Sequence, residues 1–318
     1  MKNYALAIGF LLGFLQSAAQ VKTTVSLYNV EENPDLKARI EQTASSFITE
    51  CNLAYALNIE PHFSADSVTS QVQSNVNEIW SKSKGFLCRK VRIRTLAIKR
   101  EYDNKYEIRG IPIIIREGYS QEEAILVYDQ KGNVDDFLLG VPEQQYSVLS
   151  SGKNVTDFRR RQIILNFVET FRTSYNRKDI NYLEKVFSDN ALIIVGKVIK
   201  EKTGDVPNYL SSLGAKVVLL KKTKQEYMND LKIVFKTNSY IRVDFDSISI
   251  VQHKKFEDIY GVNLIQKWSS SQYKDEGFLF LMIDFKNENE PTIYVRSWQP
   301  KEFTESKDVI NLGKFKIE

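Results

Sequence analysis

The segment from Phe167 to Gly196 constrains the fold of this chain more than any other. It places Phe171 and Tyr175 four residues apart, so that both lie on one face of a helix. A polar turn follows, in which Asp179 stands at the N-cap position of a second, short helix. The apolar, β-branched run at 191–195 then predicts a strand that is buried on both faces.

The rest of the C-terminal half extends this order of elements. A polar stretch at 200–214 precedes a helix that we expect near 224–235. Four strands should follow, at 241–251, 260–269, 277–285 and 292–298. Helices followed by a long antiparallel meander are typical of the α+β class.

The N-terminal half shows a similar order with weaker signals. A helix at 34–54 is followed by a polar segment that we expect to form a second helix and that holds Phe63, Val68, Val72, Val76, Ile79 and Trp80. Strands are expected at 91–98, 106–108 with 111–115, 122–128 and 134–139. The segment from Asp129 to Gly132 is a hairpin turn between the last two strands. A single helical turn at 144–149 and a linker at 150–154 then complete this half.

The C-terminal half resembles the nuclear transport factor 2-like superfamily, the SnoaL and ketosteroid isomerase-like cone fold. The resemblance is carried by the N-x-x-D turn that ends at Asp179 and by the F-S-D sequence that begins at Phe187. It implies two tandem cone-shaped units, each with helices packed on a curved antiparallel sheet: a degenerate unit at 20–150 and a second unit at 155–318. Paired sheets in this superfamily imply an intrachain pseudo-dimer or a homodimer. Because this scaffold carries many functions, the fold alone assigns none.

The layout of most of the chain also resembles uncharacterised exported tandem proteins of Gram-negative bacteria. These proteins end in a V-R-[ST]-W-Q-P strand, which is represented here by the residues from Val295 to Pro300. This second resemblance implies export but no activity.

The resemblance to the isomerases implies catalytic groups at two positions, and this chain has neither group. Isomerase sites need a tyrosine hydroxyl that donates to an oxyanion and a carboxylate that moves a proton. In an ungapped alignment through the turn, these positions hold Phe171 and Val195. A benzyl ring donates no hydrogen bond and an isopropyl group accepts no proton, so the isomerase reaction is not expected.

Residues 1–19 have the features of a signal peptide. Lys2 gives a short positive region, 4–15 is an apolar run, and 17–19 are small residues at the usual cleavage positions. We expect cleavage before Gln20 and a mature protein in the periplasm or outside a Gram-negative cell; a retained N-terminal anchor is the alternative. No later segment approaches about 18 consecutive apolar residues, so no transmembrane segment is expected after cleavage.

The charge of the chain argues against a nucleic-acid partner. The formal net charge is only +4 over 318 residues. Basic clusters occur at 89–94 and 159–161, and a solvated or ion-paired surface is the expected interpretation of both. No aromatic residues of the stacking kind alternate with them.

Two cysteines and two histidines leave few options for metal or thiol chemistry. Cys51 and Cys88 either form a disulfide in an oxidising compartment or act as small buried hydrophobic residues, and the sequence does not separate these interpretations. His62 and His253 stand in different halves without partners at metal-ligand spacing, so no metal site is expected.

The candidate ligand-binding residues of the C-terminal unit are Tyr175, Trp268, Asp284, Arg296 and Trp298. Asp284 and Arg296 each stand in an apolar strand, where a charge needs a partner, so a facing pair is one hypothesis. The other is that both point to solvent from the outer face of the sheet. The aromatic residues are either core residues or a platform for a ligand.

No glycine-rich phosphate loop, dinucleotide fingerprint, serine elbow or H-E-x-x-H motif is present in the sequence, so no cofactor is expected. The favoured hypothesis is an exported, non-catalytic binding module of the cell envelope, whose partner is an envelope protein or a small molecule. The alternative is a SnoaL-like enzyme with an unrecognised acid/base site in the C-terminal cone.

Overall fold

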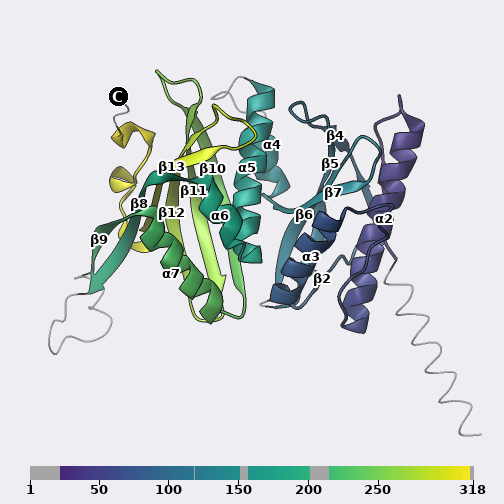
Figure 1. The fold of residues 1–318 in the computed structure, drawn as a ribbon, viewed down its shortest axis with the longest axis horizontal. Coiled ribbons are helices and arrows are strands. Elements are labelled where there is room, and N and C mark those ends of the chain that lie inside the picture. Colours follow the sequence, from purple (N-terminus) through teal and green to yellow (C-terminus); the bar gives the residue numbers. More distant parts are fainter. Residues whose placement is uncertain (1–21, 118, 151–156, 201–214, 316–318) are drawn as a thin grey trace, which may run out of the picture. The chain divides into compact units, whose positions relative to one another are not determined.

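A computed structural model describes residues 22–117, 119–150, 157–200 and 215–315 of the chain (Figure 1). The predicted signal peptide, most of the predicted linker and the polar stretch after Lys200 lie outside the described residues. The chain divides into two compact units between Glu143 and Gln144. Both combine helices with antiparallel sheet, which confirms the α+β class.

The N-terminal unit consists of two helices and seven strands within the described residues. In chain order these are β1 (Thr24–Leu27), α2 (Pro34–Leu57), α3 (Ser70–Ser83), β2 (Phe86–Leu87), β3 (Arg92–Thr95), β4 (Ala97–Lys99), β5 (Tyr106–Ile115), β6 (Ser120–Tyr128) and β7 (Val134–Gly140). The main sheet has the order β2-β5-β6-β7, and β4 also pairs with β5. The hairpin between β6 and β7 turns at Gly132, whose φ of +78° is favourable only for glycine.

Two expectations for this unit were wrong in detail. The strand expected at 91–98 is divided into β3 and β4, and β3 pairs in parallel with β1 instead of joining the meander. The second helix begins only at Ser70, after a cap by the Thr69 hydroxyl. Phe63 lies before it and stacks on Phe47 with ring centroids 4.3 Å apart.

The core of the N-terminal unit is closely packed and apolar. Phe86 and Phe137 stack with centroids 5.3 Å apart, and Phe47 approaches Phe137 at 5.7 Å. Cys51 and Cys88 are buried among these side chains and are free thiols, so the disulfide is not formed. Burial raises the pKa of both thiols, which keeps them protonated.

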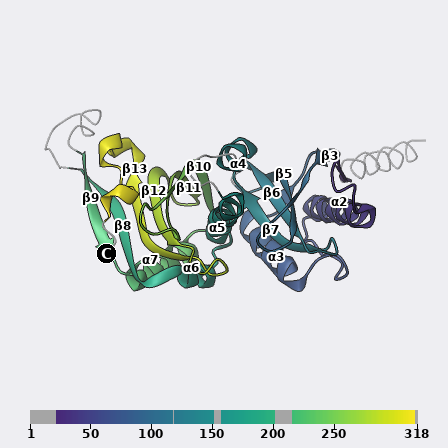
Figure 2. The same cartoon turned by 90° about the horizontal axis from the view of Figure 1, so that it is seen from above.

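The C-terminal unit contains a longer sheet. Its elements are α4 (Glu143–Ser150), which begins at the boundary, α5 (Phe158–Arg177), α6 (Ile180–Val186), β8 (Phe187–Lys200), β9 (Ala215–Lys222), α7 (Lys224–Thr237), β10 (Ile241–Gln252), β11 (Ile259–Ser270), β12 (Lys274–Asp284), β13 (Thr292–Pro300) and three 3-10 turns (Lys301–Phe303, Ser306–Asp308, Leu312–Lys314). The sheet has the order β10-β11-β12-β13-β8-β9, in which only β13 and β8 are parallel neighbours. Figure 2 shows these strands as a curved sheet, with α6 and α7 along one side.

Local capping and polar contacts set the position of α5 on the sheet. Asp157 accepts a hydrogen bond from the backbone of the second residue of α5. Asp179 accepts one from the backbone of Tyr182, the third residue of α6, and so caps this helix as the sequence predicts. Asn176 bonds both backbone groups of Val243 on β10, at 3.0 and 3.1 Å. The Arg172 side chain donates to the same carbonyl oxygen at 3.0 Å. These bonds fix the register of α5 against β10.

The strands at the start of this sheet differ from expectation. β8 begins at Phe187, directly after α6, so the three polar residues that follow belong to the strand rather than ending the helix. β9 was not expected at all. It pairs antiparallel with β8 and forms one edge of the sheet.

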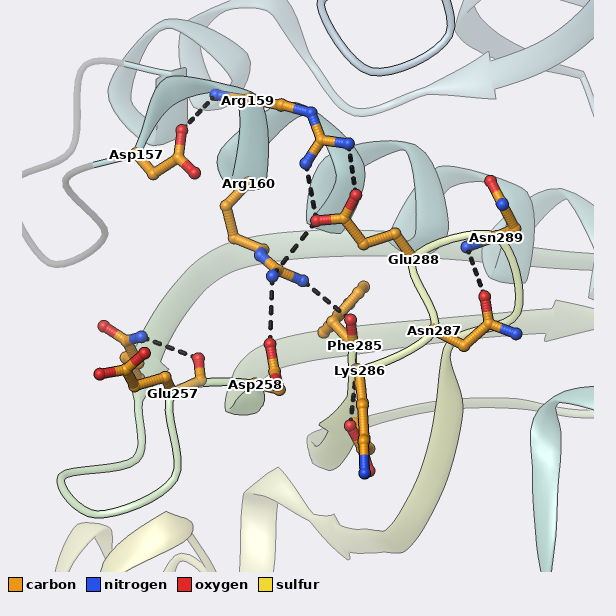
Figure 3. A network of polar contacts seen from close by, with 12 residues as sticks. Asp157, Arg159, Arg160, Glu257, Asp258, Phe285, Lys286, Asn287, Glu288 and Asn289 are labelled. Atoms are coloured by element: carbon orange, nitrogen blue, oxygen red, sulfur yellow. Dashed lines mark hydrogen bonds and ion pairs between the residues drawn. The ribbon is translucent and has the colours of Figure 1, made fainter.

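The arginines at the start of α5 belong to an ion-paired network (Figure 3). Arg159 donates to the Glu288 carboxylate at 2.7 Å, and Arg160 approaches the same carboxylate at 3.2 Å. Arg160 also reaches Asp258 at 3.1 Å and the carbonyl oxygen of Phe285 at 3.0 Å. The network therefore ties the first turn of α5 to the β10–β11 and β12–β13 connections.

None of the helices in the described part of the chain is both long enough and apolar enough to span a bilayer.

Candidate ligand-binding site

A cavity of ≈ 210 Å³ lies in the C-terminal unit between α7 and the sheet. Helix α7 forms one wall and strands β8, β9, β11, β12 and β13 form the others. The lining residues are Val195, Lys222, Tyr227, Asp230, Leu231, Val234, Gln266, Trp268, Tyr273, Asp275, Arg296 and Trp298.

Both ends of the wall helix α7 are fixed by local hydrogen bonds. Thr223 and Glu226 form a capping box, in which the hydroxyl accepts from the Glu226 backbone at 3.2 Å and the carboxylate accepts from the Thr223 backbone at 2.8 Å. At the other end, the Lys178 ammonium donates to the carbonyl oxygen of Phe235 at 3.0 Å. The helix that faces the cavity is therefore held independently of any ligand.

Arg296 is the buried cation of the cavity. It lies on β13, a central strand, between Leu281 on β12 and Ile193 on β8, and its exposed fraction is 6%. Its guanidinium carbon lies 4.9 Å from the centre of the Tyr227 ring, and Tyr175 lies close enough to stabilise its charge. Burial opposes its charge, but the two tyrosines and a nearby carboxylate outweigh burial and raise the pKa of Arg296.

Two tyrosine hydroxyls form a short chain beside this arginine. The Tyr175 and Tyr227 oxygens are 2.6 Å apart. Burial, with the nearby Tyr227, raises the pKa of Tyr175 well above its usual range, so this phenol stays neutral. The arginine therefore rests against the neutral Tyr175 hydroxyl and the ring face of Tyr227 rather than against a full negative charge.

Asp275 is the acidic group of the cavity that shows a perturbed pKa. Burial raises the pKa of its carboxyl to about 6, although the Arg296 charge acts in the opposite direction. On the β11–β12 ladder, Asp275 pairs with Trp268. Burial and the neighbouring Asp275 also raise the pKa of Tyr273 to about 12, and the Tyr273 ring stacks on Trp268 with centroids 5.9 Å apart.

Four buried polar atoms of this lining have no hydrogen-bond partner among the described residues. They are Nε of Arg296, Nε1 of Trp268, Nε1 of Trp298 and Oδ1 of Asp275. Each buried unsatisfied group costs about 1–3 kcal/mol, so such atoms are rare in native proteins and need a reason. Three donors and one acceptor around one cavity indicate a site that is completed by water or by a bound molecule.

Gly277 on β12 makes room for one of these donors. A Cβ atom at Gly277 would lie 2.5 Å from both Cε2 and Nε1 of Trp298, and 2.6 Å from the carbonyl oxygen of Gln299. Any other residue would therefore displace the indole or the neighbouring backbone. The position of Trp298 in the cavity wall depends on this glycine.

The structure brings together three of the five predicted ligand-binding residues. Trp268, Arg296 and Trp298 line the cavity, so the interpretation of Arg296 as a solvent-facing residue was wrong. Tyr175 is 1% exposed and lies behind the lining, in contact with it through its hydroxyl.

Asp284 does not belong to the site, and the facing Asp284–Arg296 pair was wrong. On the β12–β13 ladder Arg296 pairs with Leu281, and Asp284 lies three residues further along β12. Because side chains alternate along a strand, Asp284 points to the opposite face of the sheet. Its carboxylate accepts from the backbone of Lys286 at 2.7 Å instead.

Sequence reasoning missed Asp275 and Tyr227 as site residues. Asp275 stands in a polar stretch that resembles a turn, and Tyr227 has the spacing of a core residue on α7. Only the register of β11 against β12 and the packing of α7 bring them to Arg296. The two residues that stand at the catalytic positions of the isomerase alignment have different surroundings. Phe171 is fully buried, whereas Val195 lines the cavity.

Comparison with known proteins gives no family assignment. The sequence matches no protein-family profile and no curated protein. Among solved structures it is similar to Bd1075 from Bdellovibrio bacteriovorus, with 18% identity over 53% of this chain and 45% of that chain and a TM-score of 0.33. It is also similar to a nuclear transport factor 2-like protein from Cytophaga hutchinsonii (13% identity, 44% and 98% of the two chains, TM-score 0.33) and to ActVI-ORFA from Streptomyces coelicolor (9%, 44% and 96%, TM-score 0.30).

The match spans less than half of the length of Bd1075. Likenesses at these TM-scores carry no argument about function, so the candidate site rests on its own geometry.

Proposed function

We propose that the protein is an exported binding module of the cell envelope that holds a small molecule in the cavity of its C-terminal unit. The observation that carries this proposal is the group of four partnerless polar atoms around one cavity. A native fold bears their desolvation cost most easily when a ligand supplies the missing partners. Export rests on the sequence of residues 1–19, which lie outside the described structure.

Native mass spectrometry of the mature chain, purified from its own envelope fraction, tests the binding role. We expect a reproducible copurified small-molecule mass in the wild-type protein. That mass should be lost in Arg296→Gln and retained in Asp284→Asn, because Asp284 lies outside the cavity.

Thermal unfolding with added envelope extract provides a second readout of the same proposal. A ligand present at about 100 times its Kd stabilises the folded state by about 2.7 kcal/mol. Absence of both a bound mass and a shift in Tm would overturn the small-molecule role, and capture of an envelope protein instead would place the function on the surface.

A second candidate function is acid/base catalysis in the same cavity. It is favoured by the Asp275 carboxyl, whose pKa of about 6 suits proton transfer near neutral pH. Arg296 would stabilise negative charge on the reacting molecule. An enzyme would be established if the wild-type protein converts the copurified molecule to a product of different mass, and if Asp275→Asn still binds the molecule but does not convert it.

A further inference from the structure

We propose, building on the binding role above, that the ligand is a small, apolar-bodied carboxylate that pairs with Arg296 and competes with Asp275 for the arginine's charge.

The charge balance of the lining is the first support for this inference. Four charged residues line the cavity: Lys222, Asp230, Asp275 and Arg296. Lys222 and Asp230 form an ion pair with each other. Arg296 forms no ion pair with Asp275, although it is 6% exposed. Buried cations in proteins are normally paired with an anion, and among the described residues Arg296 has none at ion-pair distance.

The unsatisfied donors define the head group. Arginine and indole nitrogens only donate hydrogen bonds, so Arg296, Trp268 and Trp298 together require acceptors. A carboxylate has two oxygens with about four acceptor sites and pairs with a guanidinium in a charge-assisted bond. An amine or an amidine would instead place donors against these three groups.

The other walls define the body of the ligand. Val195, Leu231 and Val234 contribute aliphatic side chains, and Tyr227 and Tyr273 contribute rings. A volume of ≈ 210 Å³ lies below the roughly 300–1,000 Å³ of sites that hold drug-sized ligands. The ligand body should therefore be a single ring or a short chain.

Asp275 makes this binding depend on pH. The charged or titratable groups around it are Arg296 on β13, Tyr273 beside it on the β11–β12 hairpin, Tyr227 and Asp230 on α7, and Lys222 on β9. A second carboxylate at Arg296 repels the ionised form of Asp275 and raises its pKa further. Binding then takes up a proton, so affinity is highest below about pH 6 and falls by up to about tenfold for each pH unit above it.

Isothermal titration with three ring compounds of similar size tests the head group. Benzoate, neutral benzamide and cationic benzamidine are titrated into the mature protein at pH 5.5 and at pH 7.5. We expect benzoate to bind at least about tenfold more tightly than benzamide, since bonds to charged groups contribute about 1.5–3 kcal/mol, and benzamidine not to bind. Benzoate should bind about tenfold more weakly at pH 7.5, with proton uptake that appears as a buffer-dependent heat.

Variants separate the role of Arg296 from that of Asp275. Arg296→Gln should abolish the preference for benzoate. Arg296→Lys keeps the charge and should retain part of the preference, and it replaces the first variant in the test if that variant folds poorly. Asp275→Asn should bind benzoate at both pH values without proton uptake. Asp284→Asn is the matched control and should behave like the wild-type protein, because it lies on the other face of the sheet.

Equal binding of benzoate and benzamide, or no binding of benzoate at millimolar concentration, would overturn the carboxylate inference. The binding role itself fails only if neither a copurified mass nor a shift in Tm is found. A neutral or cationic mass that copurifies with the protein would overturn the carboxylate inference while leaving the small-molecule site in place.

Discussion

The N-terminal and C-terminal units both place helices on an antiparallel sheet, but they differ in what the core encloses. In the N-terminal unit, the rings of Phe86 and Phe137 and the two thiols leave a void of ≈ 10 Å³ with an apolar lining. The C-terminal unit leaves ≈ 210 Å³ and places Asp275 and Arg296 on its walls.

This contrast teaches where a ligand can bind. A void needs at least about 10–15 Å³ and several polar partners to hold even one water, so the N-terminal void is expected to stay dry. The C-terminal cavity is larger and carries unsatisfied polar atoms. A similar order of helices and strands has thus produced one core that is almost filled and one that leaves a space lined by polar atoms.

The largest expected effect tests the closely packed core. Phe137→Ala should lower the free energy of unfolding of the N-terminal unit by about 3–5 kcal/mol, because the side chain is 1% exposed, stacks on Phe86 and contacts the tilted ring of Phe47. Leu57→Ala, at a site that is 54% exposed, should change it by less than about 0.5 kcal/mol. Urea unfolding measures both, and a loss below about 1 kcal/mol for Phe137→Ala would break the comparison, since it would show a loosely packed core.

The next effect tests the charged wall of the C-terminal cavity. Folding raises the pKa of Asp275 from 3.8 to about 6, so the folded state binds this proton more tightly than the unfolded state. Stability therefore falls as pH rises from about 4 to about 6, and the cost, at about 1.4 kcal/mol per pKa unit, is at most roughly 3 kcal/mol above that window, less the part that solvent screens at this partly exposed carboxyl. Asp275→Asn should remove this pH dependence and stabilise the protein at pH 7.

Urea unfolding of wild type and Asp275→Asn at pH 4 and pH 7 measures the difference. Asp284→Asn serves as the control because its carboxylate lies outside the cavity. Equal stability of the wild type and Asp275→Asn at both pH values would show that the wall carries no desolvated acid.

A pair of substitutions compares the free space in the two cores directly. Ala124→Leu adds bulk beside the ≈ 10 Å³ void and should destabilise its unit by about 1–3 kcal/mol through overpacking. Val195→Leu adds bulk to the wall of the larger cavity and should change stability by less than about 0.5 kcal/mol while weakening ligand binding. Similar losses in both variants would mean that the C-terminal cavity is not free space.

The smallest effect concerns the ion-pair network of Figure 3. The hydrogen bond from Arg159 lowers the pKa of Glu288, so this contribution to stability is present above the ordinary pKa of a glutamate and is lost as pH falls. Glu288→Gln should cost no more than about 1 kcal/mol near neutral pH, because the network is partly exposed. The cost should shrink in high salt, and a cost that is independent of salt would contradict this interpretation.

Features that depend on nearby residues could be predicted from the sequence. The helix that carries Phe171 and Tyr175 follows from the spacing of these residues, and the start of α6 follows from Asp179, which caps its own helix. Strand β9 was missed because its apolar residues form a continuous run without alternation. Leu219 and Leu220 in that run are both exposed, which hydrophobicity does not predict.

The site could be predicted only where a residue stood out by type. Trp268, Trp298 and Arg296 are large or charged residues in apolar strands, and all three line the cavity. Asp275 reaches the cavity through the register of β11 against β12, which is a property of the folded sheet. The prediction that Asp284 faces Arg296 was wrong for the same reason. The side of the sheet to which Asp284 points depends on the alternation of side chains along β12 and on its register against β13.

The distribution of the three tryptophans gives the protein an optical reporter of its own. Trp268 and Trp298 line the cavity, whereas Trp80 lies in the other unit, against Phe86 at 5.1 Å. Replacing Trp80 by phenylalanine would leave tryptophan fluorescence only from the cavity wall. A molecule that accepts hydrogen bonds from these indoles would then shift or quench the whole emission, so that occupancy could be followed in solution without a label.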